Sequence, residues 1–210
     1  MLYALIARLL LPATWWGRLR VEGIELVPSA GPLLLVPNHD SQMDPVIVGV
    51  ALRKRRRLRF LARANLWQIP GLGPILHGMG QIPIERGAGD ADALAKAVEA
   101  LADGAAICVF PEGKLSLGEE LRARTGIARL AAACPEAQIV LCAIEGTTDF
   151  VRFPKRPRVK VTFFPPDDGL PTAADDGAAF ATRLLDQVRG RVPPATAGRR
   201  APRDKLVPAD

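Results

Sequence analysis

The sequence is poor in the residues that build metal centres and disulfide frameworks. Its 210 residues include two histidines, one tyrosine and three cysteines. Cys108, Cys134 and Cys142 have no paired spacing, and each lies in an apolar or alanine-rich run. We therefore expect reduced core cysteines and no bound metal. Basic and aromatic residues do not interleave, and no zinc-ligand or recognition-helix pattern is present, so we expect no nucleic-acid partner.

The N-terminal apolar run is too short to span a bilayer. Met1 to Trp16 is interrupted by Arg8 and is followed by Arg18 and Arg20. No small-residue cleavage site closes it, which argues against a signal peptide. We expect residues 1–18 to form a membrane-associating segment, an interfacial helix with an aromatic and basic anchor. A helix packed on the protein's own core fits the same pattern.

Positive charge is what the chain has in excess. The net charge is +6 and the isoelectric point about 9.7, which favours anionic partners such as phosphorylated metabolites or anionic lipid surfaces. The densest basic run is Arg53 to Arg59. Its first interpretation is a solvated helix end, because basic side chains suit helix C-termini. Contact with anionic lipid is the alternative.

Apolar strand-like runs alternate with helical patterns along most of the chain. This order predicts one α/β domain over residues 19–192, with a mixed, mostly parallel central sheet and helices on both faces. Residues 193–210 are rich in Pro, Ala and Arg, and we expect them to be disordered. Strands are predicted at Leu19–Val27, Leu33–Val36, Leu58–Ala62, Gln81–Ile84, Ala105–Phe110, Ile139–Ile144 and Val159–Phe164. Helices are predicted at Pro45–Leu52, Asp90–Ala102, Gly126–Ala133 and Ala174–Arg191, with a Gly- and Pro-broken helical stretch at Leu66–Met79.

Three of the predicted strands each end in a burst of polar residues. Ligands of open α/β sheets bind in the crevice beyond the carboxyl ends of the strands. If the three strands are parallel neighbours, one crevice holds a base, a carboxylate, two cations and glycine backbone. The bursts are Asn38-His39 after Leu33–Val36, Glu85-Arg86 after Ile82–Ile84, and Glu112-Gly113-Lys114 after Ile107–Phe110 and Pro111.

His39 and Asp44 are the candidates for catalysis. Five residues on a helix rotate by about 140°, so the two side chains can meet only if His39 lies in the loop before the helix. The pair Asp44-Pro45 supports this, because Asp is a favoured N-cap and Pro a favoured first helical residue. Asp44 can then hold one imidazole nitrogen while the other takes a proton from a substrate hydroxyl. A pure capping role for Asp44 is the alternative, and two oxygens allow both roles together.

Together these segments resemble the glycerolipid acyltransferases, typified by 1-acylglycerol-3-phosphate acyltransferase. That family carries an N-H-x-x-x-x-D box, a strand ending in an acidic or polar residue plus Arg, and an F-P-E-G box. The matching segments are Asn38-His39 to Asp44, Gly80 to Arg86, and Phe110-Pro111-Glu112-Gly113. A fourth box, an apolar strand, resembles Ile139 to Ile144, and the resemblance extends over roughly residues 19–164.

The third and fourth boxes depart from the usual family pattern. Lys114-Leu115-Ser116 stands where the family usually has Thr-Arg-Ser, and Leu141 or Cys142 stands where it usually has Pro. The form Phe-Pro-Glu-Gly-Lys is similar to the tafazzin branch. That branch moves acyl chains between phospholipids without coenzyme A.

The resemblance implies a membrane-associated O-acyltransferase at the cytoplasmic face of the cell membrane. It implies His39 and Asp44 as catalytic residues, acting on an acyl thioester donor and a lysophospholipid acceptor without a covalent intermediate. The donor would be acyl-CoA or acyl-carrier protein, with no further cofactor. The expected acceptor is 1-acyl-glycerol-3-phosphate, and an anionic membrane surface is the expected partner. The residues implied in substrate binding are Asn38, Arg86, Glu112, Gly113, Lys114 and Ser116.

Two further functions fit the same residues. One is an acyltransferase or transacylase with another lysophospholipid or an amine as acceptor. The other is a lipid-surface binding protein without turnover, although pure binding needs neither His39 nor Asp44. The chain has no G-x-S-x-G elbow, so a serine nucleophile is not indicated.

Overall fold

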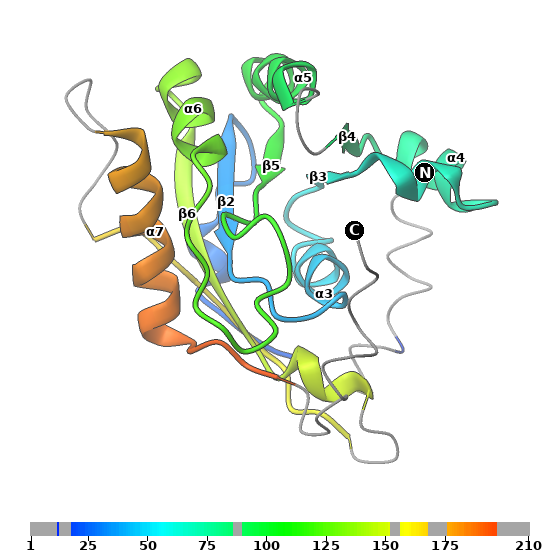
Figure 1. The fold of residues 1–210 in the computed structure, drawn as a ribbon, viewed down its shortest axis with the longest axis vertical. Coiled ribbons are helices and arrows are strands. Elements are labelled where there is room, and N and C mark those ends of the chain that lie inside the picture. Colours follow the sequence, from blue (N-terminus) through cyan, green and yellow to red (C-terminus); the bar gives the residue numbers. More distant parts are fainter. Residues whose placement is uncertain (1–11, 13–17, 86–89, 152–155, 168–175, 197–210) are drawn as a thin grey trace.

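The predicted strands assemble into one sheet of seven (Figure 1). The computed structural model describes Pro12 and residues 18–85, 90–151, 156–167 and 176–196. The strands are β1 (Arg20–Glu22), β2 (Leu33–Pro37), β3 (Leu58–Arg63), β4 (Ile82–Ile84), β5 (Ala106–Cys108), β6 (Gln138–Glu145) and β7 (Lys160–Phe164). The α-helices are α3 (Asp44–Ala51), α4 (Leu72–Gly78), α5 (Asp90–Ala102), α6 (Gly126–Ala133) and α7 (Gly177–Arg191), and the 3₁₀ turns are η1 (Ile24–Leu26), η2 (Ala64–Gln68) and η3 (Thr147–Val151).

The sheet is mostly parallel, as the sequence predicts. Its strand order is β1-β7-β6-β2-β5-β3-β4. The five strands from β6 to β4 run parallel, so their carboxyl ends meet at one edge. β7 pairs antiparallel with β6, and β1 pairs parallel with β7, so these two run the other way. The predicted α/β class with a mixed, mostly parallel sheet is confirmed.

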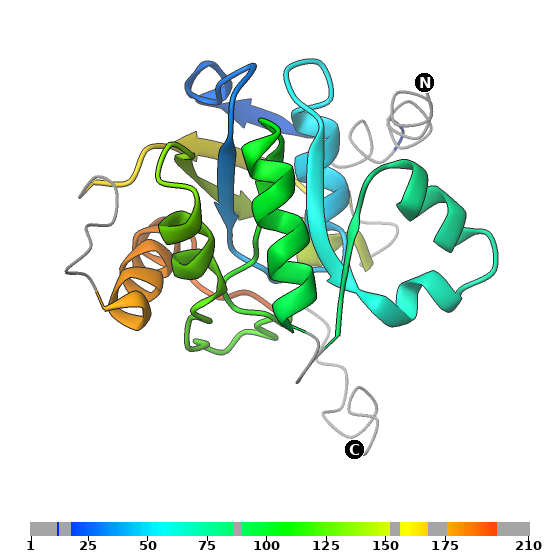
Figure 2. The same ribbon diagram turned by 90° about the horizontal axis from the view of Figure 1, so that it is seen from above.

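Both faces of the sheet are covered, which explains why the central strands are apolar throughout. Alternate residues of β2 enter two different cores. Leu34 and Val36 pack with α5, α6 and α7, while Leu33 and Leu35 pack with α3. Figure 1 shows α7 and α3 on opposite sides of β2 and β6. Figure 2 shows η2 and α4 projecting beyond the edge of the sheet that β4 forms.

The structure corrects the first predicted strand. Only Arg20–Glu22 forms a strand, and Ile24–Leu26 forms a 3₁₀ turn instead. Gly23 turns the chain with φ of 69°, and a Cβ there would lie 2.1 Å from the carbonyl oxygen of Phe163. The expected interfacial helix of residues 1–18 lies almost wholly outside the described residues, and so does most of the expected disordered tail. None of the helices within the described ranges is long and apolar enough to cross a bilayer.

Arg55 and Arg56 of the basic run Arg53 to Arg59 bind backbone carbonyls within the protein. Neither interpretation of the sequence anticipated this structural role. Arg55 donates to the carbonyls of Val27 and Glu25. Arg56 is buried, donates to the carbonyl of Pro28 at 3.2 Å, and also reaches the carbonyls of Gly31 and Gly104. Burial lowers the pKa of Arg56. Its guanidinium therefore joins two turns at the amino-terminal edge of the sheet.

We expect an Arg56→Gln variant to lose about 2 kcal/mol of unfolding free energy, because carbonyls that now pair with a cation lose that partner. For a chain of this size that corresponds to a melting temperature lowered by about 5 °C. Calorimetry or thermal circular dichroism measures the change. Lys54→Gln, two residues earlier and exposed, is the matched control. Equal melting temperatures for the two variants would contradict the structural role.

Candidate active site

Two of the three predicted polar bursts lie side by side at the carboxyl edge of the sheet. β2 and β5 are adjacent, and each leads into one of the loops that carry His39 and Glu112. β4 is separated from β5 by β3, which puts its end about 14 Å from that of β2 at the usual strand spacing. Glu85 is exposed, and Arg86 lies outside the described residues. The structure therefore joins the first and third bursts directly.

His39 and Asp44 are in contact, because His39 lies in the loop before α3. Nδ1 of His39 is 3.1 Å from Oδ2 of Asp44. The same oxygen accepts the backbone N–H groups of Asp40 at 2.8 Å and Ser41 at 2.7 Å. The other oxygen of Asp44 accepts the hydroxyl of Thr147. The buried carboxylate thus fixes both the imidazole and the loop that carries it.

Asp44 does not cap α3 in the way its sequence context predicted. It is the first residue of the helix, the N-cap is Met43, and no side chain accepts a hydrogen bond at that cap. The carboxylate instead turns back to the preceding loop, where it accepts the N–H groups of Asp40 and Ser41. This correction strengthens the positioning role, because the carboxylate bonds to the loop and not to the helix.

The imidazole of His39 lies at the rim of the site. Its ring centroid is 4.1 Å from that of Phe110, with an angle of 30° between the planes. The side chain is 17% exposed, and Nε2 forms no hydrogen bond with any of the described residues. With Nδ1 directed at Asp44, Nε2 is the ring nitrogen that a substrate hydroxyl can approach.

Glu112 holds the backbone of His39 from the neighbouring loop. Its Oε2 accepts the N–H of His39 at 2.6 Å, and its Oε1 accepts Nε of Arg189 at 2.8 Å. Burial raises the pKa of Glu112, and the hydrogen bond and charge of Arg189, together with the N–H of His39, oppose that rise. Both oxygens of Glu112, a residue that the sequence implied in substrate binding, thus accept hydrogen bonds from groups of the protein.

Asn38, Asp40 and Ser116 form a buried polar network behind His39. The amide of Asn38 donates to the carbonyl of Ile144 at 2.9 Å and to Asp40 at 3.0 Å, and its oxygen accepts the N–H of Ile144 at 2.7 Å. The Ser116 hydroxyl donates to Asp40, and the Ser116 N–H donates to the carbonyl of His39 at 2.8 Å. Their polar atoms are occupied within the protein, so this geometry favours positioning of the loop over substrate contact for Asn38 and Ser116.

Two further predicted substrate-binding residues, Gly113 and Lys114, lie at the surface of the loop that carries Glu112. Gly113 is exposed with φ of 68°, and a Cβ there would lie 3.2 Å from Cγ of Arg124. The close approach that its lack of a side chain permits is therefore to Arg124. Lys114 is exposed beside it and presents a cation to solvent. Arg86 cannot be compared, because it is not among the described residues.

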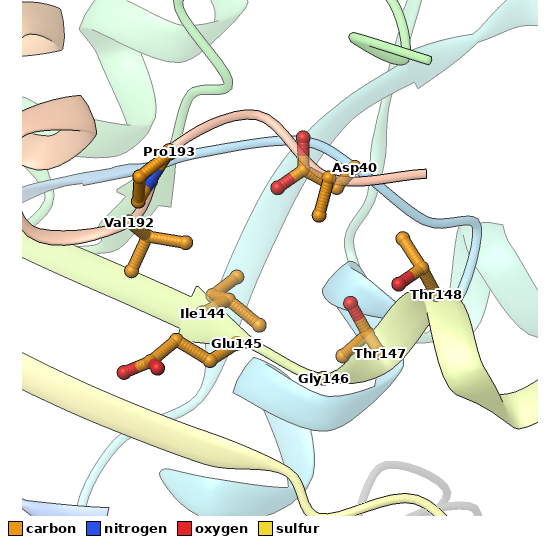
Figure 3. Close-up of a pocket in the computed structure, with 9 residues that line it drawn as sticks. Asp40, Ile144, Glu145, Gly146, Thr147, Thr148, Val192 and Pro193 are labelled. Atoms are coloured by element: carbon orange, nitrogen blue, oxygen red, sulfur yellow. The ribbon is translucent and has the colours of Figure 1, made fainter. Parts of the chain in front are cut away.

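A pocket of about 230 Å³ adjoins the buried network on the β6 side of β2 (Figure 3). Its walls include Asp40 and Thr147, both of which bond to Asp44, and Val192 and Pro193 from the segment after α7. His39 is not part of its lining. Within the described residues no group of His, Cys, Asp and Glu side chains is arranged to hold a metal ion.

Sequence reasoning missed three residues that shape the site, namely Asp40, Thr147 and Arg189. Asp40 lies inside the first box, but its partners are distant in sequence. Arg189 resembles an ordinary basic residue at a helix end. One signal was present: Leu185 precedes it by four residues on the buried stripe of α7, which places Arg189 at the edge of that stripe.

With this geometry in place, the comparison with known proteins identifies the family. The family model described as Acyltransferase matches residues 18–146, and the chain belongs to that family. The chain is 30% identical to the chloroplastic 1-acyl-sn-glycerol-3-phosphate acyltransferase of Arabidopsis thaliana over 102 residues, 47% of this chain and 28% of that protein. It is 31% identical to the lyso-ornithine lipid O-acyltransferase of Pseudomonas aeruginosa over 162 residues, 77% of this chain and 56% of that protein.

The fold is that of a known acyltransferase structure. The 1-acyl-sn-glycerophosphate acyltransferase PlsC of Thermotoga maritima superimposes with a TM-score of 0.72 at 22% identity, over 90% of this chain and 77% of that chain. In both curated relatives the chain spans less than two thirds of the length of the protein it matches. The family resemblance of the sequence boxes is confirmed at the level of the family and of the fold.

Proposed function

We propose that this protein transfers a fatty acyl group from a thioester donor to the free hydroxyl of 1-acyl-glycerol-3-phosphate. The observation that carries the proposal is the imidazole of His39, held through Nδ1 by the buried Asp44 and presenting Nε2 at the rim of the site. The family membership and the likeness to 1-acylglycerol-3-phosphate acyltransferases support the same reaction.

In the proposed reaction Nε2 of His39 takes the proton of the acceptor hydroxyl as that oxygen attacks the thioester carbonyl. The tetrahedral intermediate collapses, the carbon–sulfur bond breaks, and the departing thiolate takes the proton back from the imidazolium. Asp44 keeps the proton of the neutral ring on Nδ1 and stabilises the imidazolium while it exists. No atom of the protein becomes acylated at any step.

The other nucleophilic side chains near the site support direct transfer. The Ser116 hydroxyl is buried and donates to Asp40, and the Ser41 hydroxyl accepts the N–H of Met43. Burial raises the pKa of Cys108 and Cys142 well above the usual thiol value, which disfavours the reactive thiolate. The proposal therefore has no acyl-enzyme.

We assign the phosphate of the acceptor to basic residues that follow β4 and β5 in the sequence. Lys114 is exposed on the loop that carries Glu112, and Arg86 remains the proposed second contact on sequence grounds. A guanidinium fork and an ammonium both bind phosphate oxygens well. The net charge of +6 favours the approach of such an acceptor.

The proposal includes work at an anionic membrane surface, at the cytoplasmic face. Leu117 follows Ser116 directly, is 55% exposed, and has φ of 52°. An L-residue held in the left-handed region costs about 1 kcal/mol, so the fold keeps this apolar side chain outward at some expense in stability. We propose that this leucine, which lies next to the loop that carries His39 (the catalytic loop), contacts lipid.

A second acceptor class is favoured by one of the comparisons. The Pseudomonas aeruginosa lyso-ornithine lipid O-acyltransferase aligns with 77% of this chain, against 47% for the plant relative. Acylation of a hydroxyl on an amino-acid lipid uses the same base and the same thioester chemistry. The second candidate function is therefore O-acylation of such an acceptor.

The test is an assay of the purified full chain in detergent with radiolabelled donors and separate acceptors. The donors are acyl-CoA, acyl-carrier protein and a diacyl phospholipid, and the acceptors are 1-acyl-glycerol-3-phosphate, a lyso-ornithine lipid and lysophosphatidylcholine. We expect transfer from a thioester to 1-acyl-glycerol-3-phosphate. Transfer only to the lyso-ornithine lipid would select the second candidate, and transfer only from the phospholipid would replace the thioester donor. No transfer in any combination would leave a lipid-binding protein without turnover.

A further inference from the structure

Arg189 lies on the C-terminal helix α7, far from His39 in the sequence, yet its side chain contacts the catalytic loop. It lies in the last turn of α7, and its side chain is 11% exposed. Nη1 donates to one oxygen of Asp40 at 3.0 Å and Nη2 to the other at 2.9 Å. Nε donates to Oε1 of Glu112 at 2.8 Å, and Nη2 reaches the same oxygen. One guanidinium thus binds two buried carboxylates from two different loops.

Both carboxylates help to hold the backbone of His39, Glu112 directly and Asp40 through Ser116. Glu112 accepts the His39 N–H through Oε2, the oxygen that Arg189 leaves free. Asp40 follows His39 directly and accepts the hydroxyl of Ser116, whose own N–H donates to the carbonyl of His39. The backbone N–H and C=O of His39 are therefore both held by groups that depend on Arg189 or its partners.

We propose that Arg189 is a positioning residue of the active site, which fixes the backbone of His39 through the two carboxylates that it binds. The inference rests on the proposed function of His39 as general base. Arg189 lies beyond residues 18–146, the part of the chain that the family model matches.

The charges around His39 give the proposal a second consequence. Asp44 from α3, Asp40 from the loop and Glu112 from the β5–α6 loop place three carboxylates near His39, and Arg189 is the cation bonded to two of them. The other cations of the β5–α6 loop, Lys114, Arg122 and Arg124, are exposed. Without Arg189 the excess of negative charge favours a protonated imidazole, which is not a base.

The pKa values of the group agree with mutual dependence. Burial lowers the pKa of Arg189, but its hydrogen bonds to Asp40 and Glu112 and their charges outweigh that effect and raise it overall. In Glu112 burial raises the pKa, and Arg189 is the strongest of the influences that oppose it. Removing Arg189 leaves only the N–H of His39 to oppose the effect of burial, so the pKa of Glu112 rises further, and the protonated carboxyl is a weaker acceptor for that N–H.

The first experiment compares acyl transfer by Arg189→Gln, Arg189→Lys and Arg191→Gln over a range of pH. Arg191 is two residues further on the same helix, exposed, and stacked over the ring of Phe164 at 3.7 Å, so it is the matched control. For Arg189→Gln we expect kcat to fall by at least about tenfold with KM little changed, since small misplacement of a base is costly. The acid limb of the pH–rate profile should move upward by roughly half a pH unit.

Arg189→Lys separates charge from geometry, because it keeps the cation and loses the planar fork. We expect its acid limb to return to the native position while kcat stays lowered. If Arg189→Gln does not fold, Arg189→Lys alone carries the test, and a native kcat in that variant overturns the proposal. A fall in kcat for Arg189→Gln with no movement of the limb, or an equal effect of Arg191→Gln, also overturns it.

The second experiment does not depend on turnover, so it distinguishes failure of this inference from failure of the proposed function. The chain has two histidines, and an ¹⁵N-histidine NMR titration with a His77→Gln background isolates the signal of His39. We expect its midpoint to rise in Arg189→Gln and to stay unchanged in Arg191→Gln. An unchanged midpoint in folded Arg189→Gln refutes the inference whether or not the native protein transfers acyl groups.

Discussion

Acyl transfer by the His39→Ala variant is expected to fall by about 10²–10⁴-fold, the range typical of a lost general base. The loss should lie in kcat, because in the proposed mechanism Nε2 of the ring takes the proton, and within the described residues the only aromatic ring that it contacts is that of Phe110. The backbone contacts of residue 39 with Glu112 and Ser116 do not involve the side chain. The variant should therefore fold, with a melting temperature within a few degrees of native.

His77→Ala is the matched control for this experiment, because His77 is the other histidine of the chain and is exposed on α4. We expect native rates from it. Initial rates with the donor and acceptor found in the assay, together with thermal unfolding curves, measure both variants. A His39→Ala variant that retains more than a tenth of the native kcat would remove the general base from the mechanism. A lipid-binding protein without turnover would bind vesicles equally well with either histidine replaced.

Replacing Asp44 has the second large expected effect, because it lowers activity and stability together. Asp44→Ala removes the acceptor of two backbone N–H groups, of the Thr147 hydroxyl and of the imidazole. Buried donors without a partner cost about 1–3 kcal/mol each, so we expect a loss of about 3 kcal/mol and a melting temperature lowered by about 10 °C. Acyl transfer should fall at least 10²-fold, since the ring loses its orientation.

Asp44→Asn separates the two effects. The amide keeps one oxygen and the volume of the side chain, so the loss of stability should be smaller than in Asp44→Ala. It carries no charge to stabilise the imidazolium, so transfer should still fall by 10²-fold or more. Asp103→Asn, an exposed aspartate in the turn before β5, is the control. Native rates from Asp44→Asn would show that the carboxylate only shapes the loop.

The parts of the fold that the sequence predicted well are those set by local patterning. β2 is apolar at every position because both its faces are buried. A short apolar run of this kind has few alternatives to a buried strand. The bounds predicted for α5 and α6 also agree with the structure, because they too are set by local patterning. Ile24–Leu26 was wrongly predicted as strand, because the turn at Gly23 depends on the distant Phe163 carbonyl.

The same difference between local and long-range contacts separates the site contacts that the sequence predicted from those that it missed. His39 and Asp44 lie within one short segment, so a helix-rotation argument and a turn were enough to predict their contact. Asp40 and Arg189 are separated by 149 positions, and no local pattern indicates that they meet. Asn38 was expected to touch substrate, yet it binds β6 at Ile144, and that pairing exists only once the sheet is assembled.

The long separation of Arg189 from its partners has a consequence for biosynthesis. A chain that has left the ribosome only as far as β7 already contains His39, Asp44 and Glu112, but its two buried acids still lack their counter-cation. Such a nascent chain contains the proposed base and the carboxylate that holds it. It lacks the cation that we propose fixes the position of the catalytic loop. Because the proposed positioning requires α7, we expect a chain that ends anywhere before Arg189 to transfer acyl groups at least about tenfold more slowly than the full chain, even if its sheet has formed.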